Sequence, residues 1–580
     1  MKVTERNFCY WTEYVEEGYG LTIDSFTHEG AGYVRSWTLC SSTNTWTGTS
    51  IPELMEVLKE LCKAYQLQFH DSKTPYKDVL VIYVKNINQA YGFLYNYGVN
   101  DDFIKYSKSE GISDIVYFQI LHHIEIRPCW YKKEEIEDWD AKDLADYGTM
   151  MWQLFLKDKY SYITSNQIIR KRTEKLKRKY EDDTAKKIYP LSYDSYKLLK
   201  KAFFGGIIYA PYPGVVIPDA VVIADAKSDY YYQLLMRKHV MDKKKKVDPA
   251  NWELYLSTDS VSSYGKYKIK YTSYTNKISA FKNYDEEPCR KGEDIEDTFV
   301  FTATDLKLFL DHAQVQLIEC EWLYTYEMDD LPEYMRETYV REYLEKERLQ
   351  GKERRLQKEV VNGGYGNCCR NWTTEEEFLA DKKDPTFAPQ WGIWCTSYAR
   401  KHLLDLGDQL DGWYYGVTDS VCFKYTEENM QILEAYNEKI RSRTKKFCDK
   451  YGYDYEELKD LGCFIVEHIT LPRHFKVFCP NSYMYTEIKD GEEVTTIKAS
   501  GCNKKDLKNL SEDKKKELYK ADHIPAGTLI RNGFNPNKTH CVIDGIRYES
   551  NGSWYEKVIN EKYSDFYILV EMAVQQAMKQ

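Results

Sequence analysis

Apolar runs of strand length mark the buried strands of this chain. The run at 79–84 is continuous, which is typical of a strand that is buried on both faces. A second run, at 221–224, ends directly in an acid, Asp225. Residues 413–423 predict two short strands around a turn, with Asp419 at its tip. Because helices are predicted between these strands, we expect a fold of the mixed α/β class.

Helices are predicted over residues 51–66, 143–156, 332–361 and 425–450. The third of these is polar and is expected to stop at Gly363-Gly364, because glycine commonly ends a helix. Side chains four residues apart share a helix face, and this face carries Lys346, Gln350, Arg354 and Lys358. Three cations on one face suit a polyphosphate. An ordinary charged helix surface is the alternative.

Composition excludes several classes of protein. Hydrophobic residues make up 43% of the 580 positions and charged residues 30%, which fits neither a disordered chain nor a membrane protein. No window approaches the ~18 apolar residues of a membrane span. The first residues also lack the apolar core of a signal peptide. The net charge of −10 excludes a uniformly basic nucleic-acid coat, although a basic groove on an acidic body stays compatible.

The fifteen cysteines are scattered along the chain, and their spacing favours reduced thiols. No Cys-x-x-Cys pair is matched by a second one, which argues against a zinc site. Basic residues crowd the segment 168–187. A solvated helix or linker is the usual explanation of an isolated charge run. A connector that faces nucleic acid is the alternative.

Asp225 and Asp419 are the acids that we expect to carry the chemistry. An acid at a strand end can present a metal ligand from a rigid support, although capping of the next helix is about as frequent. Together with a cationic helix, the two acids are the groups that phosphoryl transfer by two metal ions requires. The carboxylates would bridge two Mg²⁺ ions, and the cations would hold a triphosphate.

Three motifs that surround these residues resemble the palm, fingers and catalytic-hairpin motifs of family B DNA polymerases. In chain order they are Asp225-x-x-Ser228-x-Tyr230, Lys358-x-x-x-Asn362-x-x-Tyr365-Gly366 and Tyr415-Gly416-Val417-Thr418-Asp419-Ser420. Further segments resemble the protein-primed branch of that family, which small tailed phages and linear plasmids use. They are Phe203-Phe204-Gly205-Gly206, Thr302-x-Thr304-Asp305-Leu306, Gly392-x-x-x-Thr396-x-x-Ala399-Arg400 and Ile497-Lys498-Ala499-Ser500-Gly501-Cys502. The order and spacing agree over about residues 195–505.

The resemblance implies a role for each matching residue. Asp225 and Asp419 would hold two Mg²⁺ or Mn²⁺ ions, and Tyr230 would exclude a ribose 2′-hydroxyl. The incoming nucleotide would contact Lys346, Arg354, Lys358, Asn362 and Tyr365. DNA would contact Phe203, Gly205, Gly206, Gly366, Thr396, Arg400, Tyr483 and Lys498.

The resemblance also implies a right-hand polymerase of palm, fingers and thumb, preceded by an RNase H-like domain of the exonuclease type. The expected divisions are an exonuclease-like domain at 1–167, a basic connector at 168–199, palm with a terminal-protein-region-like insertion at 200–330, fingers at 331–372, palm again at 373–430, and thumb with the C-terminal region at 431–580.

Several positions depart from the family's pattern. Val417 replaces the first acid of the hairpin motif, and Asn481 replaces the lysine of a Lys-x-Tyr motif that ends in Tyr483. The first exonuclease motif, expected at 9–13, lacks its pair of acids, and the second, at 86–90, lacks its acid. A remnant of the third falls at Asp143 or Asp146. One acid does not hold two metal ions, so we expect no proofreading.

These observations predict a DNA-directed DNA polymerase that acts on template, primer and deoxynucleotides in the cytoplasm of a bacterial host, without a membrane. The sequence leaves open whether a terminal protein serves as primer. One alternative is a degenerate homologue that binds nucleic acid or a partner. Another is nucleotide addition without a template. We favour template-directed synthesis, because the polymerase residues survive where the exonuclease acids do not.

Overall fold

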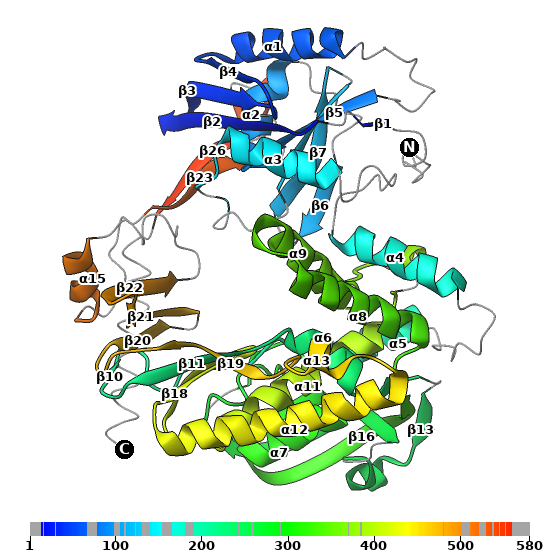
Figure 1. The fold of residues 1–580 in the computed structure, drawn as a ribbon. Coiled ribbons are helices and arrows are strands. Elements are labelled where there is room, and N and C mark those ends of the chain that lie inside the picture. Colours follow the sequence, from blue (N-terminus) through cyan, green and yellow to red (C-terminus); the bar gives the residue numbers. More distant parts are fainter. Residues whose placement is uncertain are drawn as a thin grey trace.

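The computed structural model describes most of residues 13–558 in two bodies, which Figure 1 shows one above the other. Residues 1–12 and 559–580 are outside the description. Its longer internal gaps are 66–77, 98–104, 153–164, 180–190, 500–510 and 521–528.

The upper body is built on an eight-stranded sheet in the order β4-β3-β2-β5-β8-β7-β6, with β1 beside β5. Its strands are β1 (Glu13–Tyr14), β2 (Tyr19–His28), β3 (Ala31–Cys40), β4 (Thr45–Gly48), β5 (Asp78–Val84), β6 (Lys105–Ser109), β7 (Ile112–Ile120) and β8 (Ile124–Pro128). Its helices are α1 (Ile51–Ala64), α2 (Ile87–Leu94) and α3 (Ala141–Met151).

Strand β5 is buried on both faces, as its continuous apolar run predicts. Leu80 and Ile82 belong to a core that includes α1 and α2, whereas Val79 and Val81 belong to a core that includes α3. This follows from the alternation of side chains along a strand. The helices predicted at 51–66 and 143–156 are confirmed in their described parts as α1 and α3, whereas residues 66 and 153–156 lie outside the described residues.

The lower body contains the segments that carry the predicted chemistry. Its central sheet has the order β19-β11-β18-β17-β9. These strands are β9 (Ile208–Tyr209), β11 (Val221–Ala226), β17 (Trp413–Val417), β18 (Ser420–Lys424) and β19 (Phe464–Ile469). Helices α6 (Asp229–Met236), α11 (Pro389–Gly407) and α12 (Glu427–Tyr451) pack with this sheet in one large core. The strand predicted to end at Asp225, the hairpin around Asp419 and the helix at 425–450 are therefore confirmed.

Two further sheets complete the lower body. One has the order β12-β16-β14-β15, with β13 beside β16, and the other the order β10-β20-β21-β22. Their strands are β10 (Val216–Ile217), β12 (His239–Val240), β13 (Lys245–Val247), β14 (Val261–Ser273), β15 (Gly292–Thr302), β16 (Gln314–Asp329), β20 (Phe475–Cys479), β21 (Ser482–Lys489) and β22 (Glu492–Ala499). The smaller helices are α5 (Tyr193–Lys200), α7 (Ala303–His312), α10 (Glu375–Asp381), α13 (Tyr455–Leu458) and α15 (Glu512–Leu518).

The prediction of one long helix at 332–361 is wrong, because the segment forms a hairpin of two helices. Helix α8 (Glu333–Arg348) ends before Gly351, which has a φ of 56°, and α9 (Gly351–Cys368) returns beside it. The helix also continues through Gly363 and Gly364. A Cβ on Gly364 would lie 2.5 Å from the Tyr231 hydroxyl, so glycine here permits close packing inside the helix.

The hairpin of α8 and α9 projects from the lower body towards the upper one, and α4 (Ser165–Lys179) lies along it (Figure 1). The buried Glu342 of α8 pairs with Arg172 of α4, and the amide of Gln357 donates to Glu342 over 2.7 Å. Val360 of α9 belongs to the core that includes α3. In its described part, the basic segment at 168–187 is therefore a helix packed on protein.

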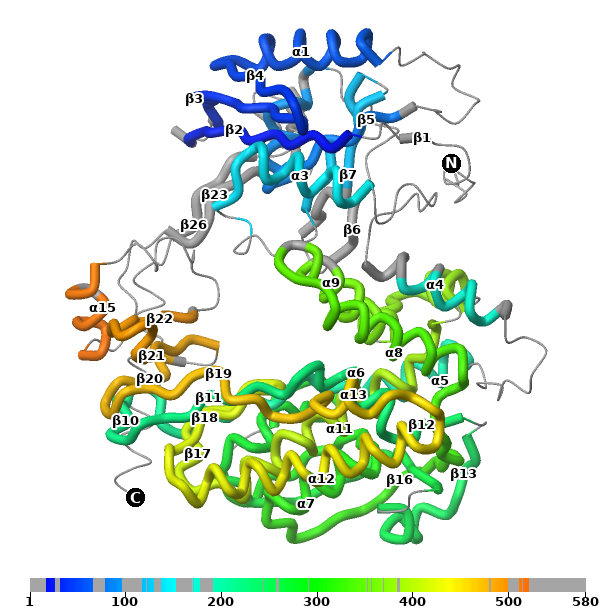
Figure 2. The backbone as a smooth tube through the Cα atoms, in the orientation of Figure 1, coloured from blue at the N-terminus to red at the C-terminus, as the bar shows by residue number. Residues whose placement is uncertain are grey.

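The C-terminal region adds two small sheets after α15, the helix that Figure 2 draws in orange. One pairs β23 (Leu529–Asn535) with β26 (Ser553–Val558), and the other pairs β24 (Thr539–Ile543) with β25 (Ile546–Ser550). The sheet of β23 and β26 lies against α2, β2 and β3. No disulfide joins the cysteines that the structure describes. Within the same residues, no helix is long and apolar enough to cross a membrane.

Candidate active site

Asp225 and Asp419 lie side by side, although 194 residues separate them in the chain. Strand β11 pairs with β18 in antiparallel register, with Asp225 opposite Ser420, the residue after Asp419. The Ala226 N–H donates to the Asp419 carbonyl over 2.8 Å, which ties the end of β11 to the hairpin turn. The turn residue Thr418 has a φ of 54°. The sheet therefore holds both acids at the same end of two neighbouring inner strands.

The two carboxylates repel one another in a partly buried place. Burial, followed by the charges of Asp419 and Glu467, raises the pKa of Asp225 well above its usual range. Burial likewise raises the pKa of Asp419, with Glu467 adding to the effect. Lys358 acts in the opposite direction on both carboxyl groups. A divalent cation would relieve this repulsion.

Glu467 is a third acid near this pair, and sequence reasoning missed it. It lies on β19, the other neighbour of β11, where the register shifts between Ile223 and Ala224. Such a bulge re-aims side chains beside it. Val417 stands where the motif that this hairpin resembles has its first acid, and the charge of Glu467 reaches both carboxyl groups from another strand. The bulge depends on strand pairing, so a local sequence pattern does not reveal it.

The residues present fit hard divalent cations. Within the described chain, no group of three or more His, Cys, Asp and Glu side chains is arranged to hold a metal ion. The site instead offers the oxygens of two adjoining carboxylates, which are the ligands that Mg²⁺ and Mn²⁺ prefer. Magnesium sites commonly use one or two carboxylates and complete the shell with water and substrate phosphates.

Tyr230 and Tyr365, both predicted to shape the nucleotide pocket, stack on each other. Their ring centroids are 4.0 Å apart and their planes differ by 7°. Tyr230 is on α6, which follows the Asp225 strand, and Tyr365 is on α9. On α9, Lys358 and Asn362 are exposed and Gly366 is half-buried. One residue of the motif at 225–230 and one of the motif at 358–366 thus meet at one wall.

The predicted phosphate-binding cations do not share one helix face. Lys346 ends α8, whereas Arg354 and Lys358 belong to α9. Lys346 is buried, and its Nζ donates to Oγ of Ser228 over 2.6 Å. Arg354 donates to the carbonyl of Lys346 over 3.2 Å. The prediction placed Lys346 and Arg354 on one face of a single helix. In the structure they lie close together because α8 and α9 fold back on each other.

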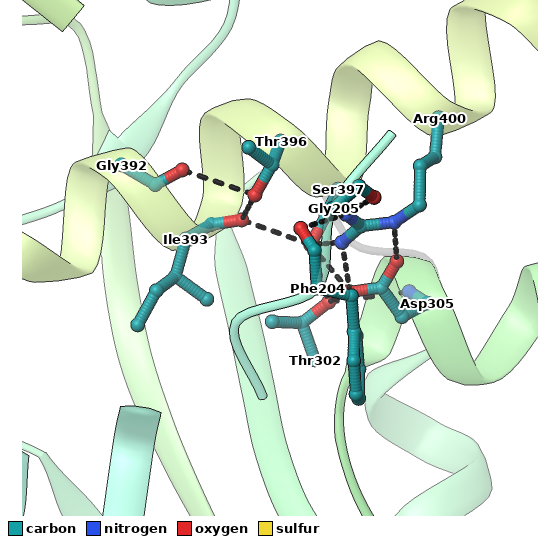
Figure 3. Close-up of polar contacts among 9 residues, drawn as sticks. All are labelled: Phe204, Gly205, Thr302, Asp305, Gly392, Ile393, Thr396, Ser397 and Arg400. Carbon is teal, nitrogen blue, oxygen red and sulfur yellow. Dashed lines mark hydrogen bonds and ion pairs between the residues drawn. The ribbon is translucent and has the colours of Figure 1, made fainter. Parts of the chain in front are cut away.

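Arg400, predicted to contact DNA, is 1% exposed and lies in a buried polar network (Figure 3). Its guanidinium donates to both carboxylate oxygens of Asp305, over 2.9 and 2.8 Å. It also donates to the carbonyls of Phe204 and Gly205, over 2.7 and 2.9 Å. Any contribution of Arg400 to DNA binding would therefore be indirect, through the loop that it holds.

The rest of this network joins three of the segments that carry the resemblance. The Thr302 hydroxyl donates to Asp305 over 3.0 Å, and the Ser397 hydroxyl over 2.5 Å. Thr396 is 3% exposed, and its hydroxyl bonds only carbonyls of its own helix, those of Gly392 and Ile393. Thr396 therefore lies inside the protein as well.

The loop at 203–206 adjoins the hairpin turn that contains Asp419. A Cβ on Gly206 would lie 2.7 Å from Oγ1 of Thr418, the turn residue before Asp419, so the backbone approaches the turn closely. Phe203 is 37% exposed. An exposed aromatic ring next to a loop near the acids is a natural stacking surface for a base.

Tyr483 and Lys498 face each other on β21 and β22. Lys498 Nζ lies 5.4 Å from the centre of the Tyr483 ring, and its charge reaches Asp225. Asn481, in the position of the missing lysine, has a φ of 60° and donates its N–H to the Tyr415 hydroxyl over 3.1 Å. A lysine thus reaches the acids from the neighbouring strand.

The upper body holds a cavity of about 250 Å³ near the ends of the parallel strands β2 and β5. Asp24 is the one acid among its lining residues. The predicted second exonuclease motif also lines it, but Asn86 caps α2 by accepting the Gln89 N–H over 3.1 Å, and Ala90 is buried. Of the first motif at 9–13, residues 9–12 lie outside the described residues and Glu13 is described only as part of β1.

The two acids suggested as a remnant of the third exonuclease motif have local roles on α3. Asp143 accepts the Asp140 N–H over 3.1 Å in a capping box at the start of the helix. Asp146 pairs with Lys142 over 3.4 Å, and both side chains are exposed.

Comparison with known proteins identifies the fold. No family model matches the sequence, and no curated protein matches it. Among solved structures, the chain is similar to Phi29 DNA polymerase complexed with primer-template DNA, with a TM-score of 0.63, 13% identity, and coverage of 93% of this chain and 100% of that one. The same polymerase complexed with single-stranded DNA gives a TM-score of 0.61 at 13% identity, covering 93% and 100%. The resemblance to protein-primed family B polymerases is therefore confirmed at the level of the fold.

Proposed function

We propose that the chain is a DNA-directed DNA polymerase that adds deoxynucleotides by two-metal phosphoryl transfer. The observation that carries the proposal is that Asp225 and Asp419 lie at the same end of the paired strands β11 and β18. The charge of Lys358 acts on both carboxyl groups and lowers the pKa of each. The fold supports it, because the Phi29 enzyme with this fold has been solved with primer-template DNA and incoming nucleotides. This proposal is compatible with priming by a terminal protein and with a role in phage replication.

Each side chain of the site would have its own role in this reaction. Asp225 and Asp419 would hold two divalent cations, which would lower the pKa of the primer's 3′-hydroxyl so that its oxygen bonds the α-phosphorus, and would stabilise the diphosphate that leaves. Lys358 is exposed and near the pair, so it would contact the triphosphate. The stacked rings of Tyr230 and Tyr365 would form the wall beside the sugar and base.

Extension of a primed template with Mg²⁺ or Mn²⁺ tests this function. We expect products whose sequence follows the template. Random or homopolymeric products, formed equally without template, would support template-independent addition instead. Absence of products on primed, unprimed and protein-primed substrates would support a homologue that only binds.

Tyr230→Ala is expected to admit ribonucleotides. Removing the ring frees the space in which a 2′-hydroxyl would clash, so discrimination against ribonucleotides should fall by about ten- to a hundred-fold, a typical steric effect. Single-nucleotide incorporation of dNTP and rNTP gives the ratio of kcat/KM. Tyr398→Ala, which removes a tyrosine on α11, serves as the control. Unchanged sugar selectivity in Tyr230→Ala would assign the gate to another residue.

We further propose that the upper body does not proofread, because the segment 9–13 holds one acid, Glu13, in place of an Asp-x-Glu pair, and the segment 86–90 holds none. End-labelled single-stranded DNA should stay intact in the presence of Mg²⁺ or Mn²⁺. Asp225→Ala protein, assayed in parallel, identifies any degradation that comes from the polymerase site. Degradation that persists in Asp225→Ala would show a working nuclease in the upper body.

A further inference from the structure

One carboxylate, Glu347, is surrounded by three cations where the α8–α9 hairpin meets the Asp225 strand. Oε2 of Glu347 lies 2.9 Å from Nζ of Lys227, and Oε1 of Glu347 lies 3.1 Å from Nζ of Lys346. Nη2 of Arg354 lies 3.1 Å from the same carboxylate. Lys227 follows β11, Lys346 lies in the last turn of α8, and Arg354 lies in the first turn of α9. Three chain segments therefore meet at this single side chain.

The cluster keeps a strong attraction for anions. Three positive charges surround one negative charge, and the side chains of Glu347 and Lys346 are only 21% and 7% exposed. Water and salt screen such partly buried charges less than surface pairs. Although burial opposes it, contact with Lys227 and Lys346 holds the pKa of Glu347 below its usual value, so the carboxylate is charged at neutral pH.

We propose that Glu347 is an internal anion that occupies the place of the incoming nucleotide's phosphates and must be displaced when a triphosphate binds. The inference rests on the proposed function and on the resemblance, which implies that Lys346 and Arg354 contact the incoming nucleotide. The Lys346 contact to Ser228, three residues after Asp225, places the cluster next to the metal-binding acids. Binding of the nucleotide therefore replaces the Glu347 carboxylate with a triphosphate, which carries more negative charge.

This exchange selects for ligand charge. A triphosphate brings several negative charges and gains contacts with all three cations, so it can replace Glu347. A single phosphate brings little more charge than the carboxylate that it removes. The cost of displacing Glu347 is the same for every ligand that replaces it, so Glu347 weakens all phosphate ligands by one factor. A triphosphate still binds because it gains several contacts, whereas a nucleoside monophosphate is left with weak binding.

A purely structural role for Glu347 makes a different prediction. Arg354 also donates to the carbonyl of Lys346, so the cluster closes the turn between α8 and α9. If closing the turn were the only role, loss of the carboxylate would loosen the hairpin. It would lower the melting temperature and leave anion binding unchanged or weaker.

Calorimetric titration of the full-length protein with inorganic tripolyphosphate, and separately with orthophosphate, distinguishes the two roles. We expect Glu347→Gln to bind tripolyphosphate about ten-fold more tightly than the wild type, on the scale of one lost charge repulsion. Orthophosphate binding should tighten by a similar factor, because both ligands displace the same carboxylate. Glu345→Gln removes an exposed charge two residues away on α8 and should stay within two-fold of the wild type.

Unchanged or weaker tripolyphosphate binding by Glu347→Gln overturns the proposal, as does an equal gain in Glu345→Gln. Glu347→Ala is measured beside it, and failure of both variants to fold would make the residue structural and overturn the proposal as well. Because the titration needs neither DNA nor catalysis, its outcome is independent of nucleotide incorporation. Tighter binding without any incorporation would reject the polymerase activity alone.

Discussion

Asp419→Asn should reduce nucleotide incorporation by at least about a thousand-fold, because the loss of a metal-binding carboxylate removes several kcal/mol of transition-state stabilisation. The amide keeps the size of the side chain and removes the charge that neighbours Asp225. Asp225→Asn should have an effect of the same order, since the two acids would hold the same ions. Single-turnover incorporation of one dNTP on a primed template measures the rate directly.

Asp411→Asn is the matched control for this prediction. Asp411 is exposed and precedes β17 of the same hairpin, so its replacement should change the rate by less than two-fold. DNA affinity should remain near the wild-type value in Asp419→Asn, because the phosphate backbone is bound mainly by basic residues. Near-normal incorporation by Asp419→Asn would remove this residue from the catalytic site.

Arg400→Met should be the most destabilising of the substitutions considered. It leaves the buried Asp305 carboxylate without its cation, and breaking such a pair costs about 3–5 kcal/mol. The two carbonyls of Phe204 and Gly205 lose their donor as well. For a body of this size we expect the melting temperature to fall by roughly 5–10 °C, as measured by scanning calorimetry.

Lys401→Met, on the same helix, is the control for Arg400→Met. Lys401 pairs with Asp405 over 2.6 Å, but about a third of each side chain is exposed, and such pairs contribute roughly 1 kcal/mol or less. Adding Asp305→Leu to Arg400→Met should recover part of the loss, because no buried charge then remains unpaired. Equal melting of Arg400→Met and wild type would show that the network does not stabilise the body.

The elements that could be predicted from the sequence are those with a local signal. The strand before Asp225 and the hairpin around Asp419 have apolar runs and a turn within a few residues. The break between α8 and α9 has one local signal, Gly351 with its positive φ, but the polar helical pattern continues on both sides of it. Gly364 carried a helix-stop signal that close packing against Tyr231 overrides.

The site was predictable to the extent that its motifs are contiguous. Asp225, Tyr230, Lys358 and Tyr365 each belong to a short motif, and the structure gathers them. Arg400 belongs to a motif too, but its burial depends on Asp305, which is distant in the chain. Glu467 and Glu347 matter through register and through three-way contacts that no single segment contains.

Anomalous scattering from Mn²⁺ in crystals of the protein with primer-template DNA and a non-hydrolysable dNTP shows whether Asp225 and Asp419 bind two metal ions. We expect two manganese peaks bound by the carboxylates of Asp225 and Asp419, and their loss in Asp225→Asn. Bound nucleotide with no manganese at either carboxylate, or with metal held elsewhere, would contradict this expectation.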